Sequence, residues 1–298
     1  MSDKPIMDFI SKEVNGMRAV QKQGMWGFID IDNNVVVPIQ YSVVSPFDCN
    51  GCAAVCKNAL WGYVGKEGEI KVPIEYDLIL AFSCDLAAVM KNGKWGFVDT
   101  NGNVVVPLEY DEVDKFIEGI ARVRKGALWG YILNNGKLLT DYRYAEAYNN
   151  TCGNLVVNEG GQRDKKWGVV SGGKWFVLSS KTGTPLTDKM YDNLSCYIDG
   201  YAKASIGCFT ENDCFVGGRW GYIDKNGIEC IPVIYDEVSN VSEGYVKVRK
   251  GFRFGLVDMK GNVIIPIEFE FISPVNYGAG FVICDGKKYP LNKGKVVD

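Results

Sequence analysis

The sequence predicts an all-β repeat protein built from eight antiparallel units of about 34 residues each. Three observations lead to this fold class. Trp-Gly dipeptides recur along most of the chain, a proline follows most of them by twelve positions, and an aromatic residue follows that proline by three. A period of this length is typical of a β-propeller or a solenoid.

The unit that begins at Trp95 predicts a β-hairpin followed by a bend. Side chains alternate from Trp95 to Asp99, which places successive side chains on opposite faces of a strand. Gly96 leaves room for another segment to pack closely over the backbone. Thr100 to Asn103 supply turn residues, and the chain returns along a β-branched run, Val104 to Val106. Pro107 is expected to stop regular pairing, because it has no N–H to donate.

The rest of the unit predicts two further strands. Tyr110 to Val113 form an extended piece, and Ala121 to Arg124 form another short strand after Gly119. The tryptophans at the equivalent positions, predicted to form the repeated structural core, are Trp26, Trp61, Trp95, Trp129, Trp167 and Trp220.

These residues resemble the bacterial WG-repeat family, also called the KWG-repeat family, over nearly the full length of the chain. The resemblance implies a β-rich repeat that is used in varied proteins. It carries over no catalytic residue.

Continuous repetition predicts a single domain over residues 1–298. The eight units begin near Met7, Tyr41, Tyr76, Tyr110, Tyr144, Tyr191, Tyr235 and Phe269. In the first unit Met7 to Ile10 stand where others have Tyr-Asp-x-Val, which predicts a strand. Residues 6 to 14 also fit a helical stripe, so a helix is the alternative there.

Eight such meanders can close as a β-propeller-like ring. The alternative is an open β-superhelix, or solenoid, in which degenerate first and last units act as caps. In the last unit Lys288 and Tyr289 stand where Trp-Gly would be.

Composition narrows the classes of partner. Net charge is −3 and the pI is about 5.3, so no global field attracts nucleic acid or an acidic membrane. No apolar run is long enough to span a bilayer, and Met1 to Asp8 lack the basic and apolar regions of a signal peptide. The expectation is a cytoplasmic protein that binds neither nucleic acid nor membrane.

Histidine is absent from the sequence, which removes the commonest general base and the familiar nucleophile triads. The carboxylate pairs Asp111-Glu112 and Asp236-Glu237 recur at equivalent positions, near strands in which basic residues alternate with apolar ones. A catalytic pair would be needed only once, so solvated strand or turn residues with cross-strand charge pairs are the simpler explanation. We expect no enzymatic activity and no cofactor.

Two features of the sequence resemble metal sites. The recurring Asp-x-Asn-Gly turn lacks the distal glutamate of a calcium loop, so a hairpin turn is predicted. Among ten cysteines, Cys49, Cys52 and Cys56 form the tightest cluster, but tetrahedral zinc would need a fourth ligand. Free thiols that act as small apolar fillers are predicted, and zinc at this cluster is the alternative.

Extra residues enter at Gly160 to Asp164, Ser171 to Gly183 and Ile206 to Gly218. Insertions in repeat proteins map to loops that often bind partners, and neutral drift in tolerant loops is the alternative. The candidate binding residues, large aromatics and an arginine outside the repeat frame, are Arg163, Trp175, Phe176, Phe209 and Phe215.

Three functions follow as hypotheses. The first is a noncatalytic scaffold that binds a protein partner through its repeat surface and inserted loops. The second is a carbohydrate or cell-wall binding module, motivated by the many aromatic residues. The third is an enzyme that uses carboxylates of the inserted region. The sequence does not identify the partner, or whether a small molecule or glycan binds.

Overall fold

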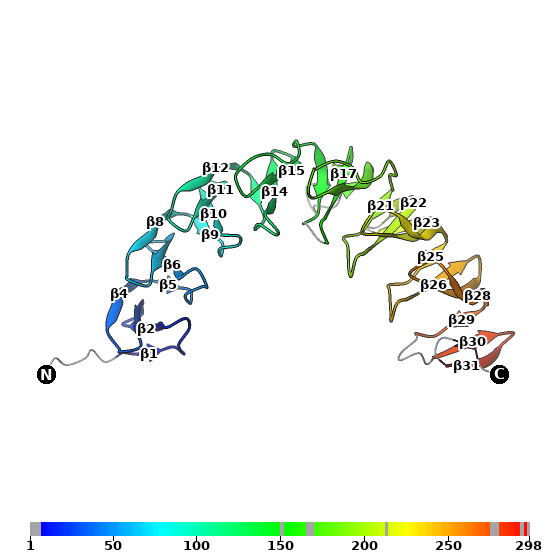
Figure 1. Ribbon diagram of the computed structural model, residues 1–298, viewed down its shortest axis with the longest axis horizontal. Helices are drawn as coiled ribbons and strands as arrows, with labels where there is room; N and C mark the ends of the chain where they lie inside the picture. Colours follow the sequence, from blue (N-terminus) through cyan, green and yellow to red (C-terminus); the bar gives the residue numbers. More distant parts are fainter. Residues whose placement is uncertain are drawn as a thin grey trace. The chain divides into compact units, whose positions relative to one another are not determined.

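The computed structural model describes residues 7–149, 152–164, 170–211, 214–274, 280–292 and 295–296. It is all-β, as predicted, and Figure 1 shows the strands grouped in chain order. Among the described residues there is no helix, and hence none that could cross a membrane. The chain divides into two compact units, Met1–Tyr142 and Arg143–Asp298. The boundary falls between the fourth and fifth repeats.

The first unit holds repeats 1 to 4, in which neighbouring strands pair antiparallel in chain order. Repeat 1 has β1 (Phe9–Ile10), β2 (Arg18–Lys22), β3 (Met25–Ile29) and β4 (Val35–Tyr41). Repeat 2 has β5 (Val43–Val44), β6 (Cys52–Lys57), β7 (Leu60–Gly65) and β8 (Ile70–Tyr76). Repeat 3 has β9 (Leu78–Ile79), β10 (Leu86–Lys91), β11 (Lys94–Asp99) and β12 (Val104–Tyr110). Repeat 4 has β13 (Glu112–Val113), β14 (Ile120–Lys125) and β15 (Leu128–Leu133).

The second unit holds repeats 5 to 8. Repeat 5 has β16 (Tyr144–Ala147), β17 (Asn154–Glu159) and β20 (Lys174–Ser179). A separate two-stranded sheet consists of β18 (Gln162–Arg163) and β19 (Val170–Ser171). Repeat 6 has β21 (Asn193–Leu194), β22 (Tyr201–Glu211), β23 (Cys214–Asp224) and β24 (Glu229–Tyr235). Repeat 7 has β25 (Glu237–Val238), β26 (Tyr245–Lys250), β27 (Arg253–Asp258) and β28 (Val263–Phe269). Repeat 8 has β29 (Phe271–Ile272), β30 (Gly280–Cys284), β31 (Lys287–Asn292) and β32 (Lys295–Val296).

The start of the chain follows the strand prediction rather than the helical alternative. Phe9 pairs with Gln21 and Ile10 with Val20, so β1 is the first strand of a complete repeat. Each of the other ordinary repeats also begins with a two-residue strand after a Tyr-Asp-like pair.

The fourth strand differs from the prediction in its length. Pro107 lies inside β12, which continues to Tyr110 and pairs it with Trp95 after a shift in register. A proline is tolerated there because the fourth strand is the outer edge of its repeat and pairs on one side. Tyr110 therefore ends one repeat, and the predicted extended piece from Tyr110 to Val113 is wrong, since β13 begins the next repeat at Glu112.

The glycine of the Trp-Gly pair is required by that fourth strand. A β-carbon on Gly96 would lie 2.5 Å from the carbonyl oxygen of Val106. Gly27 and Gly221 meet the equivalent oxygens at 2.5 and 2.4 Å. The predicted close approach over the glycine is thus confirmed, and the approaching segment is the fourth strand of the same repeat.

The recurring Asp-x-Asn-Gly turn joins one repeat to the one before it. The Asp99 carboxylate accepts the amide N–H groups of Asn101 and Asn103 at 2.8 and 2.9 Å. Gly102 has a φ of 83°, and a β-carbon there would lie 2.6 Å from the carbonyl oxygen of Lys71 in repeat 2. The turn is a hairpin closure, as predicted, and its glycine allows tight contact with the preceding repeat.

The hydrophobic core lies between successive repeats within each unit. Between repeats 3 and 4 it includes Phe97, Tyr110, Phe116 and Ile132, with Trp95 packed at its margin. Trp129 is buried (2% exposed), whereas Trp26, Trp61, Trp95 and Trp220 are half-buried. The sixth predicted core tryptophan, Trp167, lies outside the described residues.

Candidate functional site

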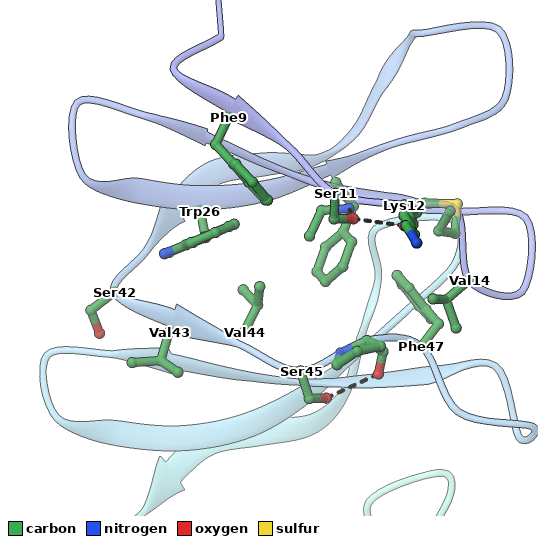
Figure 2. Close-up of a pocket in the computed structure, with 14 residues that line it drawn as sticks. Phe9, Ser11, Lys12, Val14, Trp26, Ser42, Val43, Val44, Ser45 and Phe47 are labelled. Atoms are coloured by element: carbon green, nitrogen blue, oxygen red, sulfur yellow. Dashed lines mark hydrogen bonds between the residues drawn. The ribbon is translucent and has the colours of Figure 1, made fainter.

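A cavity of about 420 Å³ lies between repeats 1 and 2, and we name it the first groove. Figure 2 shows Trp26 and Phe9 on its repeat 1 side, with Val43, Val44 and Phe47 on its repeat 2 side. Phe9 meets Trp26 edge-on, with ring centroids 5.8 Å apart. The lining is mainly apolar, so the groove favours an apolar side chain or the alkyl part of a longer one.

Equivalent grooves lie between repeats 6 and 7, with about 680 Å³, and between repeats 7 and 8, with about 250 Å³. The equivalence rests on a serine just after the first strand. Ser11, Ser195 and Ser239 line the three grooves and accept the amide N–H groups of Ala19, Lys203 and Lys247 at 2.9, 2.9 and 3.0 Å. Each serine also donates to the carbonyl oxygen of the next residue.

The residue held by the serine differs between grooves. Lys203 places its Nζ 4.8 Å from the Trp220 ring centroid and donates to the carbonyl oxygen of Val238 at 2.9 Å. Burial lowers the pKa of the Lys203 ammonium, and nearby Glu237 partly offsets this. Lys247 lies 5.5 Å from the Phe254 ring. In the first groove this position is Ala19, which leaves the Trp26 ring without such a cation.

Repeat 4 shows the same arrangement in its tightest form. The Arg122 guanidinium lies 4.0 Å from the Trp129 ring centroid and binds Asp114 through Nε at 2.6 Å. The aromatic residue of the third strand and a cation on the second strand therefore form a repeated pair, a cation–π contact. The prediction from sequence did not include this pair. The signal was present in the alternation of basic and apolar residues in Ala121 to Arg124.

Repeat 6 carries the clearest insertion. β22 and β23 are each 11 residues long, and their pairing continues beyond Ser205↔Trp220 to Glu211↔Cys214. We name the outer part, 206–211 with 214–219, the ribbon. Phe209 on the ribbon is 60% exposed and Phe215 is half-buried. Both predicted residues thus lie on one element that extends beyond the repeat frame.

Repeat 5 corrects the predicted frame. β17 pairs with β20, and Trp175 forms the bridge to Tyr191 that Trp95 forms to Tyr110 elsewhere. Trp175 therefore takes the repeat tryptophan position, with Phe176 where other repeats have glycine, and each is 3% exposed. The prediction that both lie outside the repeat frame is wrong, and so is the insertion from Ser171 to Gly183.

The insertion in repeat 5 lies instead between Glu159 and Lys174, which are paired as neighbours of a hairpin turn. It occupies the turn that the ribbon extends in repeat 6. Arg163 lies there in β18, is exposed, and forms an ion pair with Glu146. Its role in binding stays a prediction.

The recurring carboxylates are structural. Asp111 accepts the Lys94 ammonium at 2.6 Å and the amide N–H of Gly126 at 2.7 Å, and both contacts lower the pKa of its carboxyl group. Glu112 pairs with Arg124 at 2.8 Å, and Glu237 pairs with Arg249 at 3.0 Å. The predicted cross-strand charge pairs are confirmed.

The cysteines of the predicted cluster have different surroundings. Cys52 and Cys56 are buried, Cys49 is exposed, and burial raises the pKa of the Cys52 thiol. No group of three or more His, Cys, Asp or Glu residues suited to a metal ion occurs in the part of the chain that the structure describes. Among the cysteines whose side chains the structure describes, the free thiols are Cys49, Cys52, Cys56, Cys84, Cys152, Cys196, Cys208, Cys230 and Cys284.

The recurring four-stranded unit and its inter-repeat grooves define a β-repeat protein. A family profile described as "WG containing repeat" matches residues 26–61, 61–95, 95–129, 220–251 and 254–287, together more than half of the sequence. The chain belongs to the WG-repeat family. No curated protein matches the sequence.

Several solved structures show weak similarity. A structure titled as the eukaryotic initiation factor has 11% identity and a TM-score of 0.40, covering 94% of this chain and 83% of that one. The Neurospora crassa Pan2 WD40 domain has 9% identity and a TM-score of 0.30, covering 87% and 90%. Kluyveromyces lactis Hsv2 with loop 6CD replaced has 11% identity and a TM-score of 0.33, covering 80% and 77%. Superpositions with such scores carry no information on the activity of this chain.

Proposed function

We propose that the chain is a noncatalytic protein-interaction scaffold of the cytoplasm, and that the ribbon of repeat 6 is its main contact with a protein partner. One observation carries the proposal. The ribbon extends beyond the repeat, and it displays Phe209 at 60% exposure. Large exposed aromatic side chains are frequent anchors of protein interfaces.

The backbone of the ribbon supports the same role. β21 pairs with β22 only at Ala204 and Ser205, and β24 pairs with β23 only from Trp220 inward. Within the described part of the chain, no further strand pairs with the outer edges of the ribbon. An extended segment of a partner can add to such an edge through main-chain hydrogen bonds, with Phe209 beside it as an anchor.

The test compares three proteins in quantitative pull-downs from the native cytoplasm. They are the full chain, a variant in which Asn-Gly replaces residues 207–218 and so keeps the closing pair Ile206↔Arg219, and Phe209→Ser. We expect partners captured by the full chain to be lost with the shortened ribbon and reduced about tenfold or more with Phe209→Ser. Circular dichroism and thermal unfolding verify that each variant is folded.

A matched control shortens the other insertion by replacing residues 160–173 with Asn-Gly. This change removes a loop at the equivalent turn and should leave capture unchanged. Full capture by the chain without the ribbon would contradict the proposal. A glycan array run with the same proteins tests carbohydrate binding, for which we expect no signal that depends on the ribbon.

A further inference from the structure

We propose that the first groove is a second binding site, which takes the side chain of a lysine or arginine from a basic segment of a partner protein. The alkyl stem would lie along the apolar lining, and the cationic head would lie against the Trp26 ring. The site is separate from the ribbon of repeat 6 and does not depend on its role.

The chain itself supplies the pattern for this occupant. At the position of Ala19, repeats 4, 6 and 7 carry Arg122, Lys203 and Lys247, and each cation lies within 4.0 to 5.5 Å of the aromatic ring of its own third strand. Repeat 8 has the reverse arrangement, since Lys288 on β31 lies 3.8 Å from Phe281 on β30. Repeats 1, 2 and 3 have tryptophan on the third strand and alanine at this position (Ala19, Ala54 and Ala88), and Trp26 of repeat 1 lines the first groove.

The cavity has room for the missing side chain. The first groove, of about 420 Å³, is larger than the groove between repeats 7 and 8, which contains Lys247 among its lining residues. Phe28, Val44 and Met17 line it and offer apolar contact for an alkyl stem. Figure 2 shows Trp26 at one end and Lys12 at the other, so the one cation of the lining lies away from the ring.

A carboxylate at the Trp26 end favours a cation. Asp8 donates its amide N–H to the carbonyl oxygen of Gln21, the strand partner of Trp26, so it lies at that end. Its carboxylate accepts the amide N–H of Gln23, as the equivalent Asp111 accepts that of Gly126. Asp111 also pairs with Lys94 of the preceding repeat. The described contacts of Asp8 include no ion pair with a cation.

The test uses acetylated, amidated pentapeptides Gly-Ala-X-Ala-Gly, in which X is Lys, Arg, norleucine or Glu. Norleucine is the matched control, because it keeps the alkyl stem and lacks the charge. Binding is followed by the indole N–H signal of Trp26 in NMR spectra of labelled protein, assigned by its loss in Trp26→Phe. We expect the Lys and Arg peptides to shift this signal and to bind about tenfold tighter than norleucine.

The sharpest variant is Ala19→Lys, which installs the side chain that repeats 6 and 7 already carry. It should occupy the groove from within and weaken binding of the Lys peptide about tenfold or more. Ala127→Lys, an exposed position in a turn of repeat 4, makes the same charge change as a control and should bind normally. Trp26→Leu keeps an apolar wall and should abolish the preference for Lys over norleucine.

Three results would overturn the inference. The Trp26 signal could stay unmoved by the Lys and Arg peptides at millimolar concentration. Norleucine could bind as tightly as Lys, which would make the groove a site for apolar side chains alone. Ala19→Lys could bind the Lys peptide as well as the parent does. All measurements are repeated on the chain with the shortened ribbon, so failure of the groove is distinguished from failure of the scaffold role.

Discussion

The first groove and the groove between repeats 6 and 7 have the same backbone arrangement and differ in the side chains that line them. Ser11 and Ser195 hold the second strand in the same way, with amide contacts of 2.9 Å to Ala19 and Lys203. The first groove is lined by Ala19 and Trp26. The other is lined by Lys203, whose ammonium lies over the Trp220 ring of an adjoining cavity. Under the proposal above, the side chain at this position decides whether the aromatic face is covered by the chain itself or left for another molecule.

The comparison separates two kinds of position in the repeat. Tryptophan, glycine and the turn aspartate build the frame and recur in both units. The position of Ala19 varies, and carries arginine or lysine in repeats 4, 6 and 7. Frame positions should therefore affect stability alike in both regions, and the variable position should affect binding.

The largest effect on stability is expected for Trp129→Ala. This indole is buried in the core of repeat 4, and emptying a large aromatic site costs about 3–5 kcal/mol. Trp95→Ala should cost less, because Trp95 is half-buried at the margin of its cluster. Urea unfolding of both variants measures the difference. Equal losses of unfolding free energy would show that the exposure of the two indoles does not determine their contribution to stability.

The next effect concerns the glycine frame. Gly27→Ala and Gly221→Ala should each destabilise by about 3 kcal/mol, because the new β-carbon would meet a backbone carbonyl oxygen at 2.5 or 2.4 Å. The two losses should agree within about 1 kcal/mol if both regions share one frame. Denaturant midpoints measure this, and a mild effect in one region would break the equivalence of the grooves.

Phe176 provides the contrast at the same position. It is buried where other repeats have glycine, and two isolated bridges, Trp175↔Tyr191 and Leu178↔Pro185, stand there in place of a paired fourth strand. In other repeats the paired fourth strand leaves no room for a side chain at the glycine position. In repeat 5 this segment is not continuously paired, so the phenyl ring of Phe176 fits there.

The sequence predicted the frame well because its signals are local. The spacing of Trp95, Pro107 and Tyr110, and the turn after Asp99, follow from residue types within one unit. The prediction ended the fourth strand too early, at Pro107. An edge strand tolerates proline, and the sequence does not show that this strand has a pairing partner on one side only. Trp175 was missed because Trp167-Gly168 repeats the expected dipeptide, and only strand pairing with β17 reveals which tryptophan takes the position.

The grooves could not be predicted from the sequence, because they depend on contacts between repeats. Ala19, Arg122, Lys203 and Lys247 become equivalent only when the strands are in register, and their meaning depends on the ring that each one faces. Exposed aromatics such as Phe209 could be selected from the sequence, since they lie in an insertion. Half-buried aromatics such as Trp26 could not, because their open face depends on a neighbour's small side chain.

A smaller effect on stability tests the shared serine. Ser11→Ala and Ser239→Ala each remove an acceptor for a strand amide, at 2.9 and 3.0 Å, and should cost about 1 kcal/mol. Thermal unfolding of the two variants should give equal losses, with Ser171→Ala, an exposed position in β19, as a surface control. A loss of stability in only one of the two variants would mean that the grooves differ in their backbone arrangement as well as in their lining side chains.

The smallest effect on stability, and the sharpest on the comparison, is expected for Lys203→Ala. It should change the free energy of unfolding by no more than about 1 kcal/mol, because the lysine makes one hydrogen bond and one ring contact. The Trp220 ring, which lines an adjoining cavity together with Lys203, would then have alanine beside it, as Trp26 has. We expect the Lys pentapeptide to shift the Trp220 indole signal in this variant and not in the parent. Lys203→Met keeps an apolar side chain of similar length without the charge, so the Lys pentapeptide should not shift the Trp220 signal in this variant. If the Trp220 signal of Lys203→Ala does not move while the first groove binds the peptide, the residue at the position of Ala19 and Lys203 does not decide occupancy. The carboxylate of Asp8 is then the feature to remove next.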